Sequence, residues 1–225
     1  MGPRKHCPIR ISINFRCISV GNGIEGVNLK VYAIGAIENL HKALQSSGYK
    51  IPVTTTVGNY LLRDSDPPSI GDFSAEVKPP MKQMLNFLTS NGYPLLVMMY
   101  PYFKYVRDPS KIPLSYALTN STEVIVRDGN LEYKNLFDAM TDAMYSALEK
   151  VSEEGSESVE VVICETGWPT AGDWGFESIE LAQTYNQNLV KHVLSKDSQL
   201  GKLYKNALNF NQIPIVAGHD LDINY

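Results

Sequence analysis

Short, almost wholly apolar segments alternate along the chain with longer segments in which apolar residues recur at helical spacing. The apolar segments, which we expect to be strands, are residues 15–20, 53–57, 95–100 and 159–164. The segments with helical spacing are residues 29–45, 81–88, 136–151 and 179–194. Strands that are apolar on both faces are typical of parallel sheets covered by helices, so the pattern predicts an α/β fold with about four parallel βα units.

Two regions depart from this alternation. Residues 101–130 are polar with scattered aromatic residues and prolines, and we expect a long irregular loop there, of a length that is usually functional. After residue 195 the alternation stops, and the last segment has no pattern that indicates a function. The sequence thus divides into an N-terminal extension (1–14), a partial βα domain (15–195) and a divergent tail (196–225).

Composition and charge limit the possible partners. The 225 residues, 44% of them hydrophobic, are enough for one ordinary core. With 24 acidic against 20 basic residues and no basic block, nucleic acid is not an expected partner. The longest apolar runs are far shorter than the roughly 18 residues of a membrane-spanning helix, so no membrane span is expected. The 4 histidines lack Asp or Cys at metal spacing, and we expect no metal and no cofactor.

The cysteines and the N-terminal segment bear on the compartment. Cys7, Cys17 and Cys164 are too few and too widely spaced for a disulfide framework, and we expect them to be small buried residues. The N-terminal segment has no apolar stretch of signal-peptide length, so we expect no signal peptide in this chain. The triplet at residues 120–122, Asn-Ser-Thr, is an N-glycosylation acceptor motif and weakly indicates a secretory origin.

The carboxylate of Glu165 ends the fourth apolar segment, and the turn that follows carries Trp168. In a βα barrel the carboxyl ends of the strands meet at the catalytic face, where a carboxylate beside a ring that can stack on a sugar suits a glycosidase nucleophile. Taken alone, the motif is more simply explained by a glutamate that caps the turn, with Trp168 in the core.

The whole segment at residues 161–172, VVICETGWPTAG, resembles the nucleophile signature of glycoside hydrolase family 17, the plant β-1,3-glucan endohydrolases. Further resemblances follow the family's order at residues 15–22, 94–103 (PLLVMMYPYF) and 135–139 (NLFDA). The resemblance implies a partial TIM (β/α)8 barrel and retaining hydrolysis of internal β-1,3-glucosidic bonds, with β-1,3-glucan as the partner. Cys164 departs from the signature, where the family usually has Ser or Thr.

The resemblance also implies roles for individual residues. Glu165 corresponds to the nucleophile, and Asn22 to the residue that hydrogen-bonds the sugar 2-hydroxyl. The family's general acid follows that asparagine, but here the position is Gly23. Glu25 is the candidate substitute acid, although two residues of extended chain displace it by about 6–7 Å. We favour the alternative that Glu25 is a solvated loop carboxylate.

The aromatic residues Tyr100, Tyr102 and Phe103 match a family segment whose rings line the glucan groove, with ordinary core and rim packing as the alternative. Tyr100 resembles the tyrosine that orients the nucleophile. Met98 stands where the family commonly has Asn, which removes a polar contact near the cleft.

These departures leave three functional alternatives: an endohydrolase impaired by the loss of its acid, a non-catalytic β-glucan-binding protein, and an inactive truncated product. Four strands also leave two open sheet edges, which could pair with other chains and cause self-association. Family resemblance implies an extracellular, cell-wall or vacuolar location.

Overall fold

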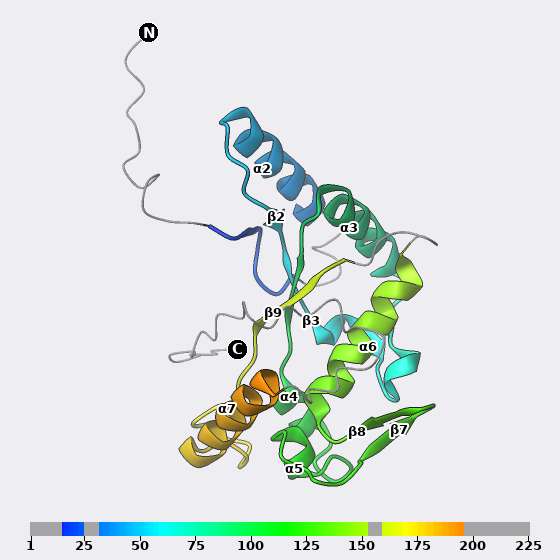
Figure 1. Cartoon of the computed structure of the whole chain (residues 1–225), viewed down its shortest axis with the longest axis vertical. Coiled ribbons are helices and arrows are strands. Elements are labelled where there is room, and N and C mark those ends of the chain that lie inside the picture. The colour runs from blue at the N-terminus through cyan, green and yellow to red at the C-terminus, as the bar shows by residue number, and fades with distance from the viewer. Residues whose placement is uncertain (1–14, 25–31, 153–158, 196–225) are drawn as a thin grey trace.

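A computed structural model describes residues 15–24, 32–152 and 159–195, and four parallel strand segments lie at its centre (Figure 1). They are β1 (Ile18–Ser19), the consecutive β2 and β3 (Val53–Thr54 and Thr56–Gly58), β6 (Leu95–Met98) and β9 (Val161–Glu165). β1 pairs with β2, and β6 lies between β3 and β9. All of these pairs are parallel, which confirms the predicted βα arrangement.

Four longer helices follow or connect these strands: α2 (Ile34–Ser46), α3 (Lys78–Asn91), α6 (Leu136–Val151) and α7 (Ile179–Leu194). The predicted bounds of the last two are confirmed. Both of these helices begin at a side-chain cap, because Asn135 accepts a hydrogen bond from the Asp138 N–H and Ser178 accepts one from the Leu181 N–H. α2 begins later than predicted, at Ile34, and residues 29–31 lie outside the described chain; α3 is longer than predicted.

The expectation of an irregular loop at residues 101–130 was wrong. The segment contains α4 (Pro101–Arg107), α5 (Leu114–Ala117) and β7 (Val126–Asp128), which forms an antiparallel hairpin with β8 (Leu131–Tyr133). Pro101 suits the first turn of a helix, and the rings of Tyr102 and Tyr105 bury one face of α4. These short elements depend on such buried side chains more than on a long periodic pattern.

The segment between β3 and α3 is also structured. It contains two 3₁₀ turns, η3 (Asn59–Leu61) and η4 (Pro68–Ile70), and the antiparallel strands β4 (Leu62–Asp64) and β5 (Asp72–Phe73). η4 and β5 pack against α6. No helix of the described chain is long and apolar enough to cross a membrane.

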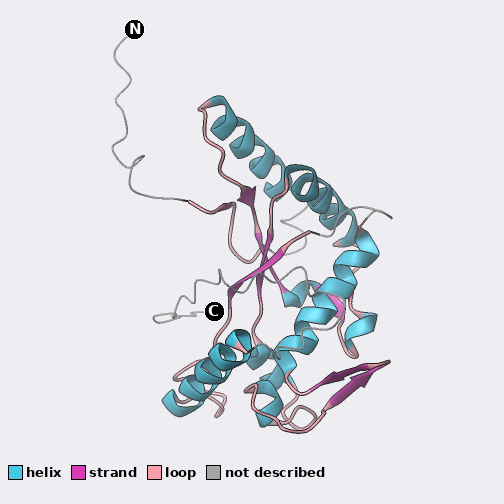
Figure 2. Ribbon diagram, viewed as in Figure 1, coloured by secondary structure: helices cyan, strands magenta, loops and turns pink. Residues whose placement is uncertain are grey.

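The core lies between the sheet and a helical layer in which α2, α3 and α6 run beside one another (Figure 2). Alternate strand residues supply the sheet side, including Val97, Val161 and Ile163, and Met84 and Met140 come from the helices. α6 is buried along most of its length, because α3, α4, α5 and β8 also contact it.

A partly buried polar contact joins α7 to α6. His192 Nε2 donates to Asp138 Oδ1 at 2.8 Å, and the other carboxylate oxygen accepts from the Asn135 side chain. His192→Leu should therefore leave a buried carboxylate without one of its donors and lower the free energy of unfolding by about 2–3 kcal/mol. Urea denaturation measures the change, with the exposed Lys191→Ala as the control that should alter stability by less than about 0.5 kcal/mol. Equal effects of the two substitutions would contradict a special contribution from this contact.

Candidate active site at the carboxyl edge of the sheet

The sheet brings the ends of its parallel strands to one edge. Asn22 follows β1, Tyr100 follows β6, and Glu165 ends β9. Parallel strands present their carboxyl ends on the same side, so these three residues lie at one edge of the sheet. Backbone hydrogen bonds reach this edge, because the Ile24 N–H donates to Thr56 O at 3.1 Å and the Met99 N–H to Glu165 O at 2.9 Å.

The Glu165 carboxylate is held by a tyrosine. The hydroxyl of Tyr100 donates to Glu165 Oε2 at 3.0 Å. Burial first, and then the hydrogen bond and negative charge of Glu165, raise the pKa of Tyr100, so its hydroxyl stays protonated and continues to donate. Glu165 remains partly exposed. A half-buried carboxylate oriented by a donor can act as a nucleophile towards a ligand at this edge.

Gly23 occupies the position at which the family resemblance implies a general acid. Gly23 has a φ of 61°, in the left-handed region. A Cβ at this position would lie 2.8 Å from Met98 Cε and 3.3 Å from Tyr60 Oη. Met98 is itself the strand partner of Glu165. A thioether and a phenol therefore border the space that a side chain at position 23 would enter.

Tyr60 was not among the residues that the sequence pattern indicated. It lies in η3, immediately after β3, and is 44% exposed. The only sequence feature that could have indicated Tyr60 is its position just after a strand, and that strand is short. Glu25, the proposed substitute acid, lies outside the described residues.

The aromatic residues named from sequence divide into buried and open rings. Tyr102 and Trp168 are only 5% and 6% exposed, and their ring centroids lie 5.1 Å apart. The Trp168 N–H also donates to Phe176 O at 2.8 Å. These two rings pack within the protein and have little surface to offer a sugar. Phe103 is 37% exposed, so part of its ring faces solvent.

Cys17 and Cys164, which we expected to be buried, are only partly buried, and Cys7 lies outside the described residues. Burial raises the pKa of Cys17. Burial, followed by the charge of Glu165, raises the pKa of Cys164 to about 11. Cys164 therefore places a neutral thiol directly before the carboxylate at neutral pH.

The rate of alkylation tests the raised pKa of Cys164. At pH 8 we expect iodoacetamide to modify Cys164 in the native protein about a hundredfold more slowly than in the urea-unfolded chain, because the thiolate is the reactive form. The native rate should climb as the pH approaches 11. Peptide mapping by mass spectrometry follows Cys164 separately from the other cysteines, and rapid native labelling at pH 8 would contradict the raised pKa.

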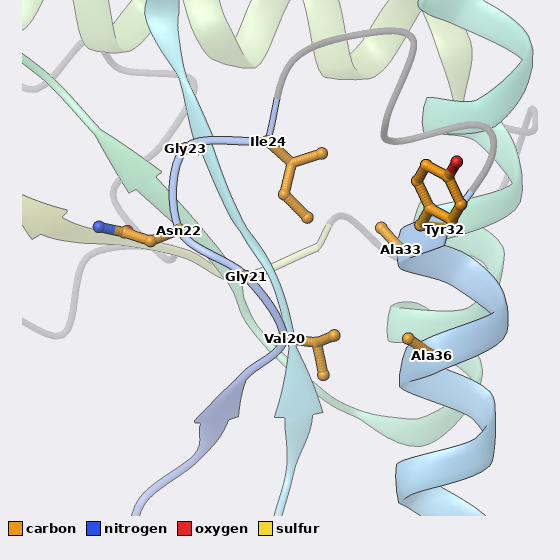
Figure 3. Close-up of a pocket in the computed structure, with 8 residues that line it drawn as sticks. All are labelled: Val20, Gly21, Asn22, Gly23, Ile24, Tyr32, Ala33 and Ala36. Carbon is orange, nitrogen blue, oxygen red and sulfur yellow. The ribbon is translucent and has the colours of Figure 1, made fainter.

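A cavity of about 530 Å³ lies beside this edge, between the residues after β1 and the start of α2. Val20, Ile24 and Tyr32 contribute to its lining. The Asn22 side chain points away from the other lining residues (Figure 3). Asn22 and Gly23 line this cavity, whereas Tyr100 and Glu165 do not. Within the described residues, no group of three or more His, Cys, Asp or Glu side chains is placed to hold a metal ion.

A carboxylate at the carboxyl ends of parallel βα strands lies where βα-barrel enzymes have their active sites, and it matches one of the two carboxyl groups that a glycosidase uses. The profile of glycosyl hydrolases family 17 matches residues 6–207. A glucan endo-1,3-beta-glucosidase of Glycine max is 42% identical over 193 residues, which are 84% of this chain and 71% of the relative. The chain belongs to glycosyl hydrolases family 17.

Solved structures agree with this assignment. A β-1,3-glucanase and allergen of Cryptomeria japonica pollen aligns with a TM-score of 0.76 and 42% identity, covering 84% of this chain and 59% of that chain. A plant β-glucan endohydrolase aligns with a TM-score of 0.74 and 37% identity, covering 80% of this chain and 58% of that chain. The fold is therefore part of a (β/α)8 barrel.

The chain spans only part of the length of each of these proteins. It spans 65% of a barley relative that is 41% identical, and 53% of a Vitis vinifera glucan endo-1,3-beta-glucosidase that is 40% identical. In the described part of the chain the parallel strands form a two-stranded and a three-stranded sheet, and neither is closed.

Proposed function

We propose that this chain binds β-1,3-glucan at the edge formed by Asn22, Tyr100 and Glu165, and that it is an endohydrolase whose hydrolysis of internal β-1,3-glucosidic bonds is impaired. The observation that carries the proposal is the Tyr100 hydrogen bond, which orients Glu165 at the catalytic edge of a family 17 fold. In this proposal Glu165 is the nucleophile, Asn22 contacts the sugar 2-hydroxyl, and Phe103 forms part of the groove wall.

The impairment follows from the chemistry of retaining glycosidases. They need two carboxyl groups about 5–5.5 Å apart, one to attack the anomeric carbon and one to protonate the leaving oxygen. Glu165 performs the first task. Gly23 cannot perform the second, and general acid catalysis typically contributes about 10²–10⁴-fold to the rate. Glu25 stays a candidate for a partial substitute.

A second candidate function is glucan binding without catalysis. It is favoured by Met98 and Tyr60, which border the space of the missing acid and supply no carboxyl group there. Partly open rings such as Phe103 would remain available for a sugar.

One paired assay tests the proposal and separates the two candidates. The chain and its Glu165→Gln variant are incubated with insoluble β-1,3-glucan, and bound protein and released reducing sugar are measured together. Binding by both proteins, with slow sugar release only by the wild type, supports an impaired hydrolase. Binding without any Glu165-dependent release favours the binding protein, and absence of binding by folded protein would overturn both.

We also propose a secretory location, in the cell wall or vacuole, for the protein in a plant. A 39%-identical relative from Nicotiana plumbaginifolia is named a basic vacuolar isoform of glucan endo-1,3-beta-glucosidase. Asn120, the acceptor of the glycosylation triplet, is exposed after α5, where a glycan would not disturb the core. Self-association through the edges at β1 and β9 is a further proposal, because open strand edges can pair with other chains.

A further inference from the structure

The loop between β9 and α7 carries an exposed tryptophan that the proposed site does not use. Trp174 is 60% exposed, although the other tryptophan of the chain, Trp168 in the same loop, is buried. An indole ring left open on a loop that begins at the catalytic edge is a candidate ligand surface.

Trp174 is connected to the carboxylate through a row of aromatic contacts. Tyr100, which holds Glu165, lies 5.5 Å from Phe103 between ring centroids, and Phe103 lies 5.3 Å from Tyr102. Trp174 stacks on Tyr102 at 6.4 Å with 16° between the ring planes. We call these four rings the aromatic row. It begins at the Glu165 edge and ends at Trp174.

Glu177 fixes the loop that carries Trp174. The Tyr102 hydroxyl donates to Glu177 Oε1, and the Phe176 N–H donates to Oε2 at 3.0 Å. Burial raises the pKa of the Glu177 carboxyl, but these hydrogen bonds lower it by more. The pKa therefore lies below its usual value. A Cβ at Gly172 would lie 2.8 Å from Glu177 Cγ, so glycine lets the loop pass close to this side chain. These contacts tie the loop to α4 without a ligand, and such preorganisation reduces the entropy cost of binding.

We propose that Trp174 is an outer platform for a glucosyl residue of β-1,3-glucan, at the opposite end of the aromatic row from Glu165. The proposal rests on the proposed function, because it takes glucan as the ligand of the adjoining edge. The open indole face can cover the apolar C–H face of a pyranose while the sugar hydroxyls stay in water. Because three ring-to-ring steps of 5.3–6.4 Å connect Tyr100 to Trp174, we expect an oligosaccharide of several glucosyl units to be needed to reach both ends of the row.

The dependence of binding affinity on oligosaccharide length tests the platform. The full chain with Glu165→Gln, which should not turn over its ligand, is compared with the same chain carrying Trp174→Ala in titration calorimetry with laminaritriose and laminarihexaose. We expect Trp174→Ala to weaken hexaose binding about tenfold and to leave triose binding unchanged. Leu194→Ala, an exposed apolar residue at the far end of α7, is the matched control and should change neither affinity.

Fluorescence gives an independent readout, because Trp174 is the exposed one of the chain's 2 tryptophans. Hexaose should shift the emission of the parent to shorter wavelength, and Trp174→Phe should remove that shift. Equal hexaose affinity with and without Trp174, or an equal loss for both oligosaccharides, would overturn the platform while glucan binding at the Glu165 edge stands. Absence of hexaose binding by every folded variant would overturn the proposed function and the platform with it.

Discussion

Gly23→Glu is expected to raise the rate of laminarin hydrolysis by roughly 10²–10⁴-fold, the usual contribution of a general acid. Position 23 follows β1 at the same edge as Glu165, and its side chain would start beside Met98, the strand partner of Glu165. A carboxyl there could protonate the leaving oxygen and later activate water. Reducing-sugar release by wild type and variant, with folding verified by circular dichroism, measures the gain.

Two local features should reduce this gain. The φ of 61° at Gly23 costs a side-chain-bearing residue roughly 1–2 kcal/mol, and the Met98 methyl lies where the new side chain begins. Because that methyl ends a flexible side chain, Gly23→Glu combined with Met98→Ala should be more active than Gly23→Glu alone.

Gly23→Gln is the matched control, since it has the same size and backbone strain but no acidic proton. Equal rates for the Gln and Glu variants would contradict an acid at this position. If the folded double variant gains nothing, the missing carboxyl is not the defect that limits hydrolysis. Substantial wild-type hydrolysis that is abolished by Glu25→Gln would instead assign the acid to Glu25.

The elements that could be predicted from sequence are those whose determinants are local. α6 and α7 have long helical periodicity and begin directly after the capping residues Asn135 and Ser178, so their bounds could be found without a structure. α4 is too short to show a periodic pattern, and it depends on Tyr102 and Tyr105, whose burial comes from contacts with Trp168. The sequence of residues 101–130 therefore suggested a loop.

The same distinction applies to the site. Glu165 could be placed at the catalytic edge because it ends an apolar strand, and this needs only the strand direction and the parallel fold. The exposure of the two tryptophans could not be predicted, because they lie in one loop and differ only in distant neighbours. Trp168 is covered by Tyr105 and Tyr185, from α4 and α7, whereas among the described residues Trp174 stacks on Tyr102 and stays 60% exposed.

An activated aryl glycoside should react with the wild-type chain even though glucan hardly does. A dinitrophenyl β-laminaribioside has a leaving group that needs little protonation, so Glu165 can attack the anomeric carbon without an acid. Hydrolysis of the resulting glycosyl ester needs a base to activate water, and Gly23 does not provide one. We therefore expect a rapid release of about one dinitrophenolate per protein, followed by a much slower phase.

Two measurements identify the intermediate. Mass spectrometry of the quenched protein should show one added laminaribiosyl group on the peptide that contains Glu165, and Glu165→Gln should show neither the burst nor the added mass. Azide is a small anionic nucleophile that needs no general base, so it should accelerate the slow phase. It should recover part of the roughly 10²–10⁴-fold in rate that is lost because position 23 has no carboxyl group. Gly23→Glu should remove the accumulation, because its carboxylate can activate water.

A burst that persists in Glu165→Gln would show that another residue is the nucleophile. Continued rapid release of dinitrophenolate by the wild type, with no slow phase, would show that the chain has a general base. Glu165 can attack the glycoside without a base, but the glycosyl ester cannot be hydrolysed rapidly without one.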